Sequence, residues 1–270
     1  MIFWILLLIV ILLAVCYVLL VMPRPSAGPD LAPILCDYAH RGLFSKGEIP
    51  ENSMGAFKRA VEKGVGIELD LRLTADGRVV VFHDETLERM CGKKVPISAL
   101  PWEKLKNERL QDTEYGIPLF EDVLRLVGGR VPLLIELKGE DSNDELCWKV
   151  APMLDAYRGD FCLESFNPLL LRWFVKHRPE MVRGQLVTDL IKEGREGSKF
   201  VNFALTHMLF NFLSRPDFIA CDGKYQKDPA FFVCRKIFRA PFFLWTVRKK
   251  ALLEHNHRRG DYSIFENFEP

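Results

Sequence analysis

Short apolar runs alternate with longer amphipathic segments seven or eight times along the chain, between residues 34 and 265. Such alternation is typical of strands and helices that form a parallel βα architecture. The chain has 270 residues, which suits one such unit, because α/β barrels of about 250 residues fold as one domain. We therefore predict a TIM (β/α)8 barrel. An open doubly wound sheet is the alternative, but no glycine-rich dinucleotide motif follows the first apolar run.

Apolar spacing and capping residues predict where each element begins and ends. The expected strands are residues 34–39, 65–73, 78–82, 131–136, 161–164, 183–187, 218–221, 241–245 and 261–265. The expected helices are residues 53–64, 121–127, 144–157, 168–176, 200–213, 229–238 and 248–257, with a short one near 101–105. In the second strand, Ile67, Leu69 and Leu71 share one face, and Glu68 and Asp70 share the other.

Residues 1–22 carry no charged side chain and are rich in Ile, Leu and Val. About 20 apolar residues are enough to span a bilayer as a helix. The alternative is a cleaved signal peptide, but this segment lacks a basic start, has a long apolar run, and has no A-x-A cleavage site. We therefore expect an uncleaved single-pass anchor over residues 1–22, a stiff linker over 23–33, and the barrel over 34–270.

Charge and cysteine usage bear on the compartment and on partners. Arg24 directly after the span favours a cytoplasmic barrel, although one charge leaves the membrane side open. The seven cysteines show no C-x-x-C spacing, which fits free thiols in a reducing compartment better than a disulfide framework. The net charge of +1 argues against nucleic acid as a partner, since nucleic-acid-binding domains carry a basic face.

Two carboxylates, Glu68 and Asp70, stand two residues apart in a predicted strand, so both point to the same side. Convergent carboxylates repel each other unless water solvates them or a cation lies between them. Taken alone, the pair would fit a solvated strand face. Glu136 ends another predicted strand and could add a third oxygen ligand, which favours a hard divalent cation such as Ca²⁺ or Mg²⁺.

Two histidines, His40 and His83, each end a predicted strand close to these carboxylates. A single histidine at such a position is more often structural, but a pair fits a general acid and a general base. Arg41 suits phosphate oxygens, because its planar guanidinium donates hydrogen bonds in pairs, and Lys138 would add a second positive charge. Cation, Arg, Lys and two His together indicate phosphoryl chemistry.

The chain resembles the glycerophosphodiester phosphodiesterase family over about residues 35–266. The matching motifs are H-R-G (His40, Arg41, Gly42), E-N (Glu51, Asn52), E-x-D (Glu68, Asp70), H-D (His83, Asp84), P-L-F-E (Pro118 to Glu121), E-L-K (Glu136 to Lys138), S-F-N-P (Ser165 to Pro168) and W-T-V (Trp245 to Val247). They occur in the family's order, and this multi-part match is specific for the fold.

The resemblance implies a TIM barrel that hydrolyses glycerophosphodiesters to glycerol phosphate and an alcohol. It also implies a role for each site residue. One divalent cation, Ca²⁺ or Mg²⁺ with Mn²⁺ as a third option, would bind to Glu68, Asp70 and Glu136. The other implied roles are His40 and His83 as acid and base, Arg41 and Lys138 on the phosphate, Glu51, Asn52 and Asp84 ordering the site, and Phe166 and Trp245 lining the pocket.

Three features depart from the family pattern. Arg248 follows Trp245-Thr246-Val247 where the family usually has Asn, and Glu266-Asn267 replaces a Thr-Asp or Ser-Asp pair. Residues 197–213 are unusually apolar and could touch lipid, or could form an ordinary barrel helix.

Two alternative functions follow. One is a lysophospholipase D-like or phospholipase C-like enzyme acting on membrane lipids, and the other is a non-enzymatic anchored barrel.

Overall fold

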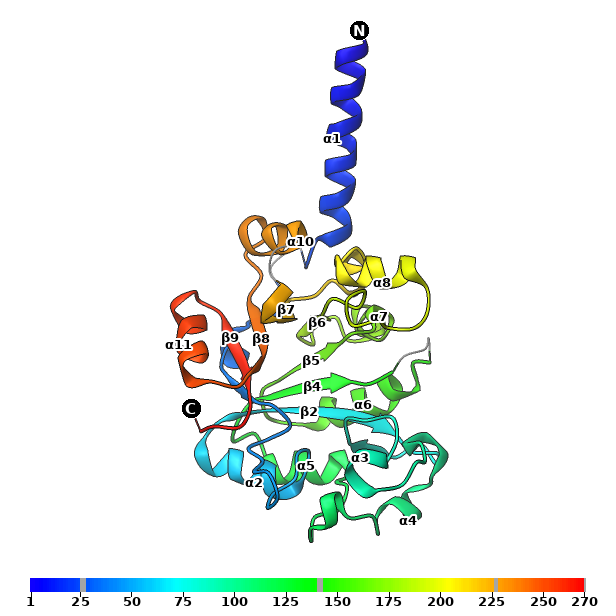
Figure 1. Cartoon of the computed structure of the whole chain (residues 1–270), viewed down its shortest axis with the longest axis vertical. Helices are drawn as coiled ribbons and strands as arrows, with labels where there is room; N and C mark the ends of the chain where they lie inside the picture. The colour runs from blue at the N-terminus through cyan, green and yellow to red at the C-terminus, as the bar shows by residue number, and fades with distance from the viewer. Residues whose placement is uncertain (25–27, 140–142, 226–227, 270) are drawn as a thin grey trace.

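In the described part of the chain, eight parallel strands close into a barrel (Figure 1). The computed structural model describes residues 1–24, 28–139, 143–225 and 228–269, so residues 25–27 of the predicted linker lie outside it. The barrel strands are β1 (Tyr38–Ala39), β2 (Gly66–Leu73), β4 (Leu133–Leu137), β5 (Phe161–Ser165), β6 (Arg183–Val187), β7 (Phe218–Asp222), β8 (Phe242–Val247) and β9 (Tyr262–Phe265). Parallel pairing of β1 with both β2 and β9 closes the ring, which confirms the predicted TIM barrel. The ninth strand, β3 (Val79–Val81), pairs antiparallel with β2 outside the ring.

Helices connect the strands and cover the outside of the barrel (Figure 1). They are α2 (Met54–Lys63), α3 (Glu88–Cys91), α4 (Trp102–Leu105), α5 (Phe120–Val127), α6 (Glu145–Ala156), α7 (Pro168–His177), α8 (Lys199–Thr206), α9 (Asn211–Ser214), α10 (Pro229–Phe232), the π-helical turn η5 (Val233–Ile237) and α11 (Lys250–Arg258). Helix α2 shows why the sequence predicts their ends. The Ser53 hydroxyl accepts the Ala56 N–H at 3.2 Å, and Gly64 ends the helix with a φ of +67°.

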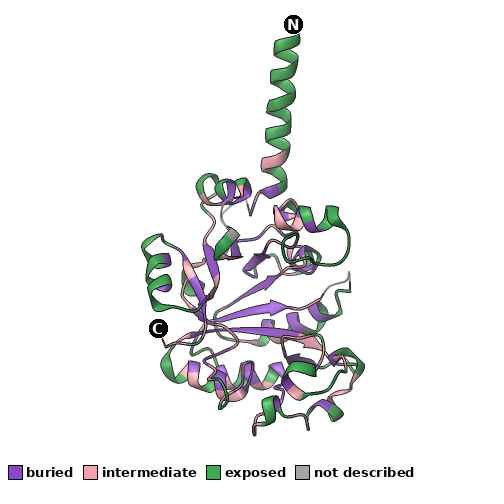
Figure 2. Cartoon of the chain, in the orientation of Figure 1, coloured by how far each residue is buried: buried purple, intermediate pink, exposed green. Residues whose placement is uncertain are grey.

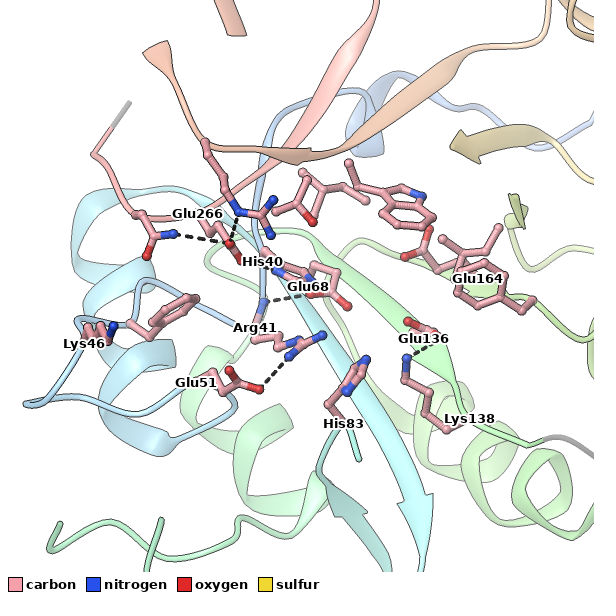
Figure 3. A pocket seen from close by; sticks show the side chains of 18 of the residues that line it. His40, Arg41, Lys46, Glu51, Glu68, His83, Glu136, Lys138, Glu164 and Glu266 are labelled. Atoms are coloured by element: carbon pink, nitrogen blue, oxygen red, sulfur yellow. Dashed lines mark hydrogen bonds and ion pairs between the residues drawn. The ribbon is translucent and has the colours of Figure 1, made fainter. Parts of the chain in front are cut away.

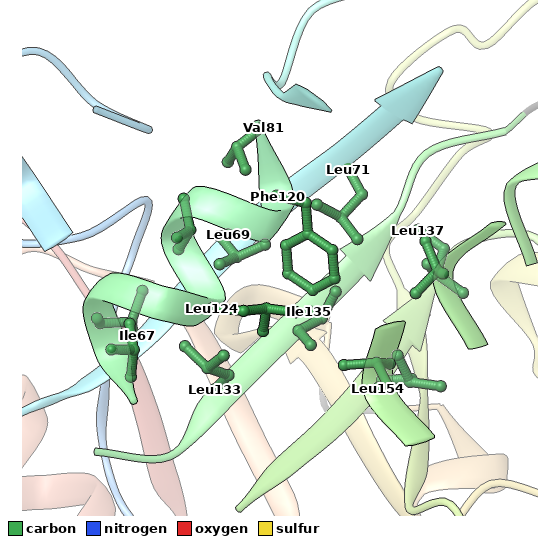
Figure 4. Packing of buried hydrophobic residues seen from close by; sticks show 14 of the residues in the cluster. Ile67, Leu69, Leu71, Val81, Phe120, Leu124, Leu133, Ile135, Leu137 and Leu154 are labelled. Atoms are coloured by element: carbon green, nitrogen blue, oxygen red, sulfur yellow. The ribbon is translucent and has the colours of Figure 1, made fainter. Parts of the chain in front are cut away.

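The alternation along β2 separates the core from the site. Ile67, Leu69 and Leu71 are fully buried against the helical layer, where Phe120 and Leu124 of α5 pack on them (Figure 4). Because successive side chains of a strand point to opposite sides, the carboxylates between them point into the barrel. Truncating the fully buried Phe120 to Ala would cost about 3–5 kcal/mol of stability.

Three predicted elements differ from the structure. Only Tyr38–Ala39 of the expected strand 34–39 forms a strand, because Ile34 ends the 3-10 helix η1 (Ala32–Ile34) and residues 35–37 are an irregular connection. The expected helix 200–213 is two helices, α8 and α9, separated near Met208, whose φ of +54° is incompatible with a continuous helix. The expected helix 229–238 changes from α-helical to π-helical geometry at Val233.

Helix α1 (Ile2–Val21) is the one helix of the described chain that is long and apolar enough to cross a membrane. A signal sequence near an N-terminus meets the same criterion. The helix projects from the barrel and is exposed over most of its length (Figure 2). Its last residue, Val21, is nevertheless fully buried, and Arg24 bonds to the backbone of Pro216 and forms an ion pair with Asp217.

Candidate active site

A cavity of about 440 Å³ opens among the ends of the barrel strands, and ten charged or ionisable side chains labelled in Figure 3 surround it. Most of the residues predicted from the sequence line this cavity: His40, Arg41, Glu51, Glu68, His83, Glu136, Lys138, Phe166 and Trp245. The cavity forms where the strand ends of a TIM barrel place catalytic groups.

The predicted metal ligands form one buried cluster. Glu68, Asp70 and Glu136 each offer a carboxylate oxygen, and these oxygens lie within 4.8 Å of one another. Strand register explains this proximity, because Asp70 of β2 is paired with Glu136 of β4. Oxygen-only donors at this spacing suit Ca²⁺ or Mg²⁺, so the donor set fits a divalent cation.

Glu164 is a fourth carboxylate in the same row and was missed by the sequence analysis. It is paired with Glu136 across β4 and β5, is 1 % exposed, and lines the cavity. In the described residues its Oε2 atom has no hydrogen-bond partner, which leaves a buried acceptor beside the cluster. The available signal was its position at the end of an apolar strand, the same position that singled out Glu136.

Burial and mutual repulsion strongly shift the pKa values of these carboxylates. Burial together with the charge of Asp70 raises the pKa of Glu68 well above its ordinary value. Burial also raises the pKa of Glu136, and it raises that of Glu164 still further with the help of the charge of Glu68. Burial of Asp70 acts in the same direction, but the charges of Lys138, His83 and Arg41 and the hydrogen bond from Asn52 together outweigh it and hold the pKa of Asp70 well below its ordinary value. The raised pKa values favour the protonated forms of Glu68, Glu136 and Glu164, so protons and a cation would compete for the cluster.

Two basic side chains lie among the acidic ones. The Lys138 ammonium is 3.0 Å from Asp70 Oδ1 and 2.6 Å from Glu136 Oε1. The Arg41 guanidinium donates to Glu51 Oε1 at 2.6 Å, and its backbone N–H donates to Glu68 Oε2 at 2.7 Å. Both basic groups line the cavity, so the positive charge that phosphate recognition requires is present at the site.

A strained loop holds Arg41 in this position. Arg41 and Asn52 have φ values of +56° and +52°, in the left-handed region that side-chain-bearing residues rarely adopt. The Asn52 N–H bonds to the Arg41 carbonyl at 2.9 Å, and its side-chain amide donates to Asp70 Oδ2 at 2.7 Å. Gly42 has a φ of +82°, and a Cβ there would lie 2.9 Å from Ala56. The loop thus joins Arg41 to the carboxylate cluster.

His40 follows β1 and is held by the far end of the chain. Its Nδ1 atom lies 2.7 Å from Glu266 Oε2. Burial lowers the pKa of His40 below its ordinary value, and the hydrogen bond to Glu266 only partly opposes that effect. A neutral ring that donates Nδ1–H to Glu266 would have an unprotonated Nε2 available as a base.

His83 lies across the cavity in a similar arrangement. Its Nδ1 atom is 2.7 Å from Asp84 Oδ1, and Arg89 bonds to Asp84 Oδ2 at 2.6 Å. Arg89 also donates to Glu51 Oε1 at 2.7 Å, so one guanidinium joins the carboxylates beside His83 and Arg41. No local sequence pattern marks Arg89, because its pairing with Glu51 spans 38 residues.

Two aromatic residues and a second cavity complete the site. The rings of Phe166 and Trp245 meet edge to face, with centroids 5.8 Å apart. Phe166, His83 and Lys138 also line a neighbouring cavity of about 830 Å³. The segment 188–213 contributes five apolar side chains to this second cavity, Leu190, Val201, Leu205, Phe210 and Leu213, together with polar ones such as Glu193 and Arg195. An apolar space therefore adjoins the polar one.

Comparison with known proteins identifies relatives in sequence and in fold. Residues 40–260 match the model of the glycerophosphoryl diester phosphodiesterase family. A glycerophosphodiester phosphodiesterase of Caldanaerobacter subterraneus is 40 % identical over 241 residues, which cover 82 % of this chain and 89 % of the relative. Human lysophospholipase D GDPD3 is 32 % identical over 247 residues, which cover 84 % of this chain and 74 % of the relative. The crystal structure of a glycerophosphodiester phosphodiesterase from Thermotoga maritima superimposes with a TM-score of 0.65 at 26 % identity, covering 85 % of this chain and 94 % of that one.

Proposed function

The chain belongs to the glycerophosphoryl diester phosphodiesterase family and is a phosphoric diester hydrolase, and from this premise we propose how its residues act. It hydrolyses glycerophosphodiesters to a glycerol phosphate and an alcohol, with His40 and His83 transferring protons. The observation that carries this proposal is the convergence of both histidines, both basic side chains and the carboxylate cluster on one cavity.

Glu68, Asp70 and Glu136 hold one divalent cation, and Ca²⁺ and Mg²⁺ fit the oxygen ligands best, with Mn²⁺ as a third option. When bound, the cation neutralises charge on the phosphate oxygens and so stabilises the transition state. Arg41 and Lys138 bind the remaining phosphate oxygens, and Glu51, Asn52 and Asp84 keep the surrounding side chains in place. Phe166 and Trp245 pack against the glycerol part.

The glycerol hydroxyl next to the phosphoester is the nucleophile. His40, which burial favours in its neutral form, takes the proton from this hydroxyl as its oxygen attacks phosphorus. The bond between phosphorus and the alcohol oxygen breaks, and His83 protonates the leaving alcohol. In the second half, water loses a proton to one histidine and opens the cyclic phosphate, while the other protonates the released glycerol oxygen.

The test uses the full chain in detergent, stripped of metal and assayed on glycerophosphocholine, glycerophosphoethanolamine and glycerophosphoglycerol. Ca²⁺, Mg²⁺ and Mn²⁺ are restored one at a time. We expect metal-dependent release of glycerol phosphate that His40→Ala and Glu68→Gln both abolish, with metal binding lost only in Glu68→Gln. Turnover that persists in either variant would contradict the assigned roles.

A lipid substrate is the second candidate, and the apolar cavity favours it. That cavity shares His83, Lys138 and Phe166 with the catalytic one and could hold one acyl chain beside the phosphate. The similarity to human lysophospholipase D GDPD3 supports the same assignment. On lysophosphatidylcholine, release of choline would indicate the lysophospholipase D-like reaction, and release of phosphocholine the phospholipase C-like one. Leu205→Asn in that cavity should slow turnover of the lysolipid and leave glycerophosphocholine turnover unchanged; equal effects on both would refute this candidate.

Helix α1 acts as a retained anchor rather than a cleaved signal sequence. The Val21 carbonyl accepts hydrogen bonds from Asn211 Nδ2 at 2.9 Å and from Cys234 Sγ at 3.4 Å, and both donors are buried. Cleavage after Val21 would remove the acceptor of two buried donors, which is costly. Mass spectrometry of the protein isolated from membranes should find the peptide that contains residues 1–24, and its absence would indicate cleavage.

A further inference from the structure

Large apolar side chains are exposed on one part of the barrel. Seven of the ten exposed large hydrophobic residues that follow α1 in the described chain lie between residues 191 and 237. Five of them define what we call the apolar face: Phe200 and Phe203 on α8, Phe212 on α9, Phe232 on α10 and Ile237 in η5. The most exposed are Phe200 at 71 % and Phe232 at 63 %. Soluble surfaces rarely gather such residues, so the face indicates a binding partner.

The base of α1 is seated among the same elements. Helix α1 contacts α9 and η5, and Val21 packs in one buried cluster with Met208, Phe231 and Cys234. Tyr17 and Val18 of the preceding turn pack against this cluster. In Figure 1, α8 and α10 flank the end of the molecule from which α1 projects, and Figure 2 shows exposed residues on both. The apolar face therefore surrounds the point where α1 leaves the barrel.

The length of α1 determines where the apolar face lies relative to the bilayer. Its 20 residues extend about 30 Å, which equals the thickness of a typical hydrocarbon core. The part of α1 before Tyr17 is free of the barrel and extends only about 22 Å. That length is about 8 Å less than the thickness of the hydrocarbon core of the bilayer. Spanning the bilayer therefore requires the last turn of α1 to lie at its boundary. The elements that pack around that turn must then lie at the boundary as well.

The charges around the face suit a lipid headgroup region. Lys199 begins α8, Lys236 lies in η5, and Arg239 follows shortly after; all three are exposed. Basic residues close to an anionic membrane surface each contribute about 1 kcal/mol. Phenylalanines flanked by lysine and arginine are typical of segments that insert shallowly into the interface.

We propose that the apolar face is a second membrane contact, distinct from the anchor. Its side chains enter the boundary between headgroups and acyl chains of an anionic bilayer, and the three basic residues bind the headgroups. The contact gives the barrel one orientation relative to the membrane, in addition to the attachment that α1 provides. This inference goes beyond the proposed activity and does not depend on catalysis.

The test measures whether tryptophans placed on the face contact lipid. The full chain is reconstituted into vesicles of phosphatidylcholine and phosphatidylglycerol, with or without phosphatidylcholine brominated near the top of its acyl chains. Phe200→Trp and Phe232→Trp are compared with Leu252→Trp on α11, a site that is 46 % exposed and outside the face. The five native tryptophans, Trp4 in α1 among them, are present in every sample, so quenching of each added tryptophan is the difference from the unsubstituted chain.

We expect bromolipid to quench the added tryptophans at 200 and 232 at least twofold more than the one at 252. Equal quenching at all three sites would overturn the proposal. The added tryptophans could instead be shielded from iodide and yet not be quenched by bromolipid. If cross-linking then also gave a dimer, two copies of the chain would cover the apolar face, and the proposal would be wrong. Unchanged thermal unfolding of each variant in detergent verifies that the substitutions leave the fold intact.

Discussion

Glu266 Oε2 lies 2.7 Å from His40 Nδ1, which joins the last strand of the barrel to the histidine that follows the first. Arg248 bonds to the other carboxylate oxygen of Glu266 at 2.6 Å. Both Arg248 and Glu266 depart from the family pattern, and the structure places them in one hydrogen-bonded chain that ends at His40. The departures are therefore linked to each other and to the proposed catalytic machinery.

Glu266→Gln should lower kcat roughly 10- to 100-fold, the scale known for groups that orient a functional histidine. The pKa of His40 should also fall further, because the hydrogen bond to Glu266 is one of the interactions that raise it. NMR titration, with His40 assigned through His40→Asn, measures the shift. Glu269→Gln is the matched control, since Glu269 is exposed and pairs with Arg59 and Lys63 outside the cavity. A rise in the pKa of His40 would contradict the arrangement.

Glu266 should also contribute to acid stability. Burial acts to raise its pKa, but the hydrogen bonds and positive charges of His40 and Arg248 together outweigh burial and lower the pKa to about 2, from an ordinary value near 4.5. A carboxylate with a depressed pKa stabilises the fold above pH 4.5, and this contribution is lost as the pH falls toward 2. Between pH 5 and pH 2.5, the Tm of Glu266→Gln should therefore decline less than that of the wild type. Parallel declines would show that Glu266 does not carry this dependence.

Removing His83 should cost more than removing the carboxylate that holds it. His83→Ala should lower kcat by roughly 10²–10⁴, the usual contribution of a general acid or base. Asp84→Asn should have a smaller effect, because the imidazole remains and loses only its 2.7 Å partner. His257→Ala on α11 is the control, since His257 pairs with Asp37 and does not line the cavity. A larger loss of kcat in Asp84→Asn than in His83→Ala would contradict the proposed roles of the two residues.

Metal binding should release protons and strengthen as the pH rises. Burial raises the pKa of Glu68 and Glu136, so as the pH falls these carboxylates take up protons that a cation must displace. Each proton released increases the affinity about tenfold per pH unit below the pKa concerned. Calorimetry of Mg²⁺ or Ca²⁺ binding in buffers of different ionisation enthalpy counts these protons. Glu164→Gln should keep metal binding, since Glu164 lies outside the three-ligand set, and pH-independent affinity would contradict the prediction.

Arg24→Gln should destabilise the junction between α1 and the barrel. Arg24 Nε lies 2.7 Å from Asp217 Oδ1, and the Asp217 side chain is 3 % exposed. Loss of the guanidinium leaves a buried carboxylate short of a partner, at a cost of about 1–3 kcal/mol, which lowers Tm by about 2–4 °C per kcal/mol. Arg125→Gln breaks an exposed ion pair with Asp122 and should change Tm little. Equal melting of both variants in detergent would mean that the Arg24 contact is not stabilising.

Local patterns in the sequence predicted most of the architecture. The period-two alternation around Glu68 and Asp70 determined which side of β2 faces the core, and the Ser53 cap and Gly64 determined the limits of α2. The predicted helix 200–213 was wrong, because its apolar spacing continues through Met208 while its backbone does not. Periodicity describes which face an element buries, and it does not reveal a single residue in the left-handed region.

The sequence by itself determined the order of strands and helices, the apolar span at the N-terminus, and a set of polar residues at strand ends. These properties depend on spacing along a few neighbouring residues. Only the tertiary structure decided that Glu164 joins the carboxylate row, that Glu266 holds His40, and that α1 is seated beside α9. Those contacts connect distant segments, and they follow from strand register and from closure of the barrel, which bring together residues as far apart in the chain as His40 and Glu266.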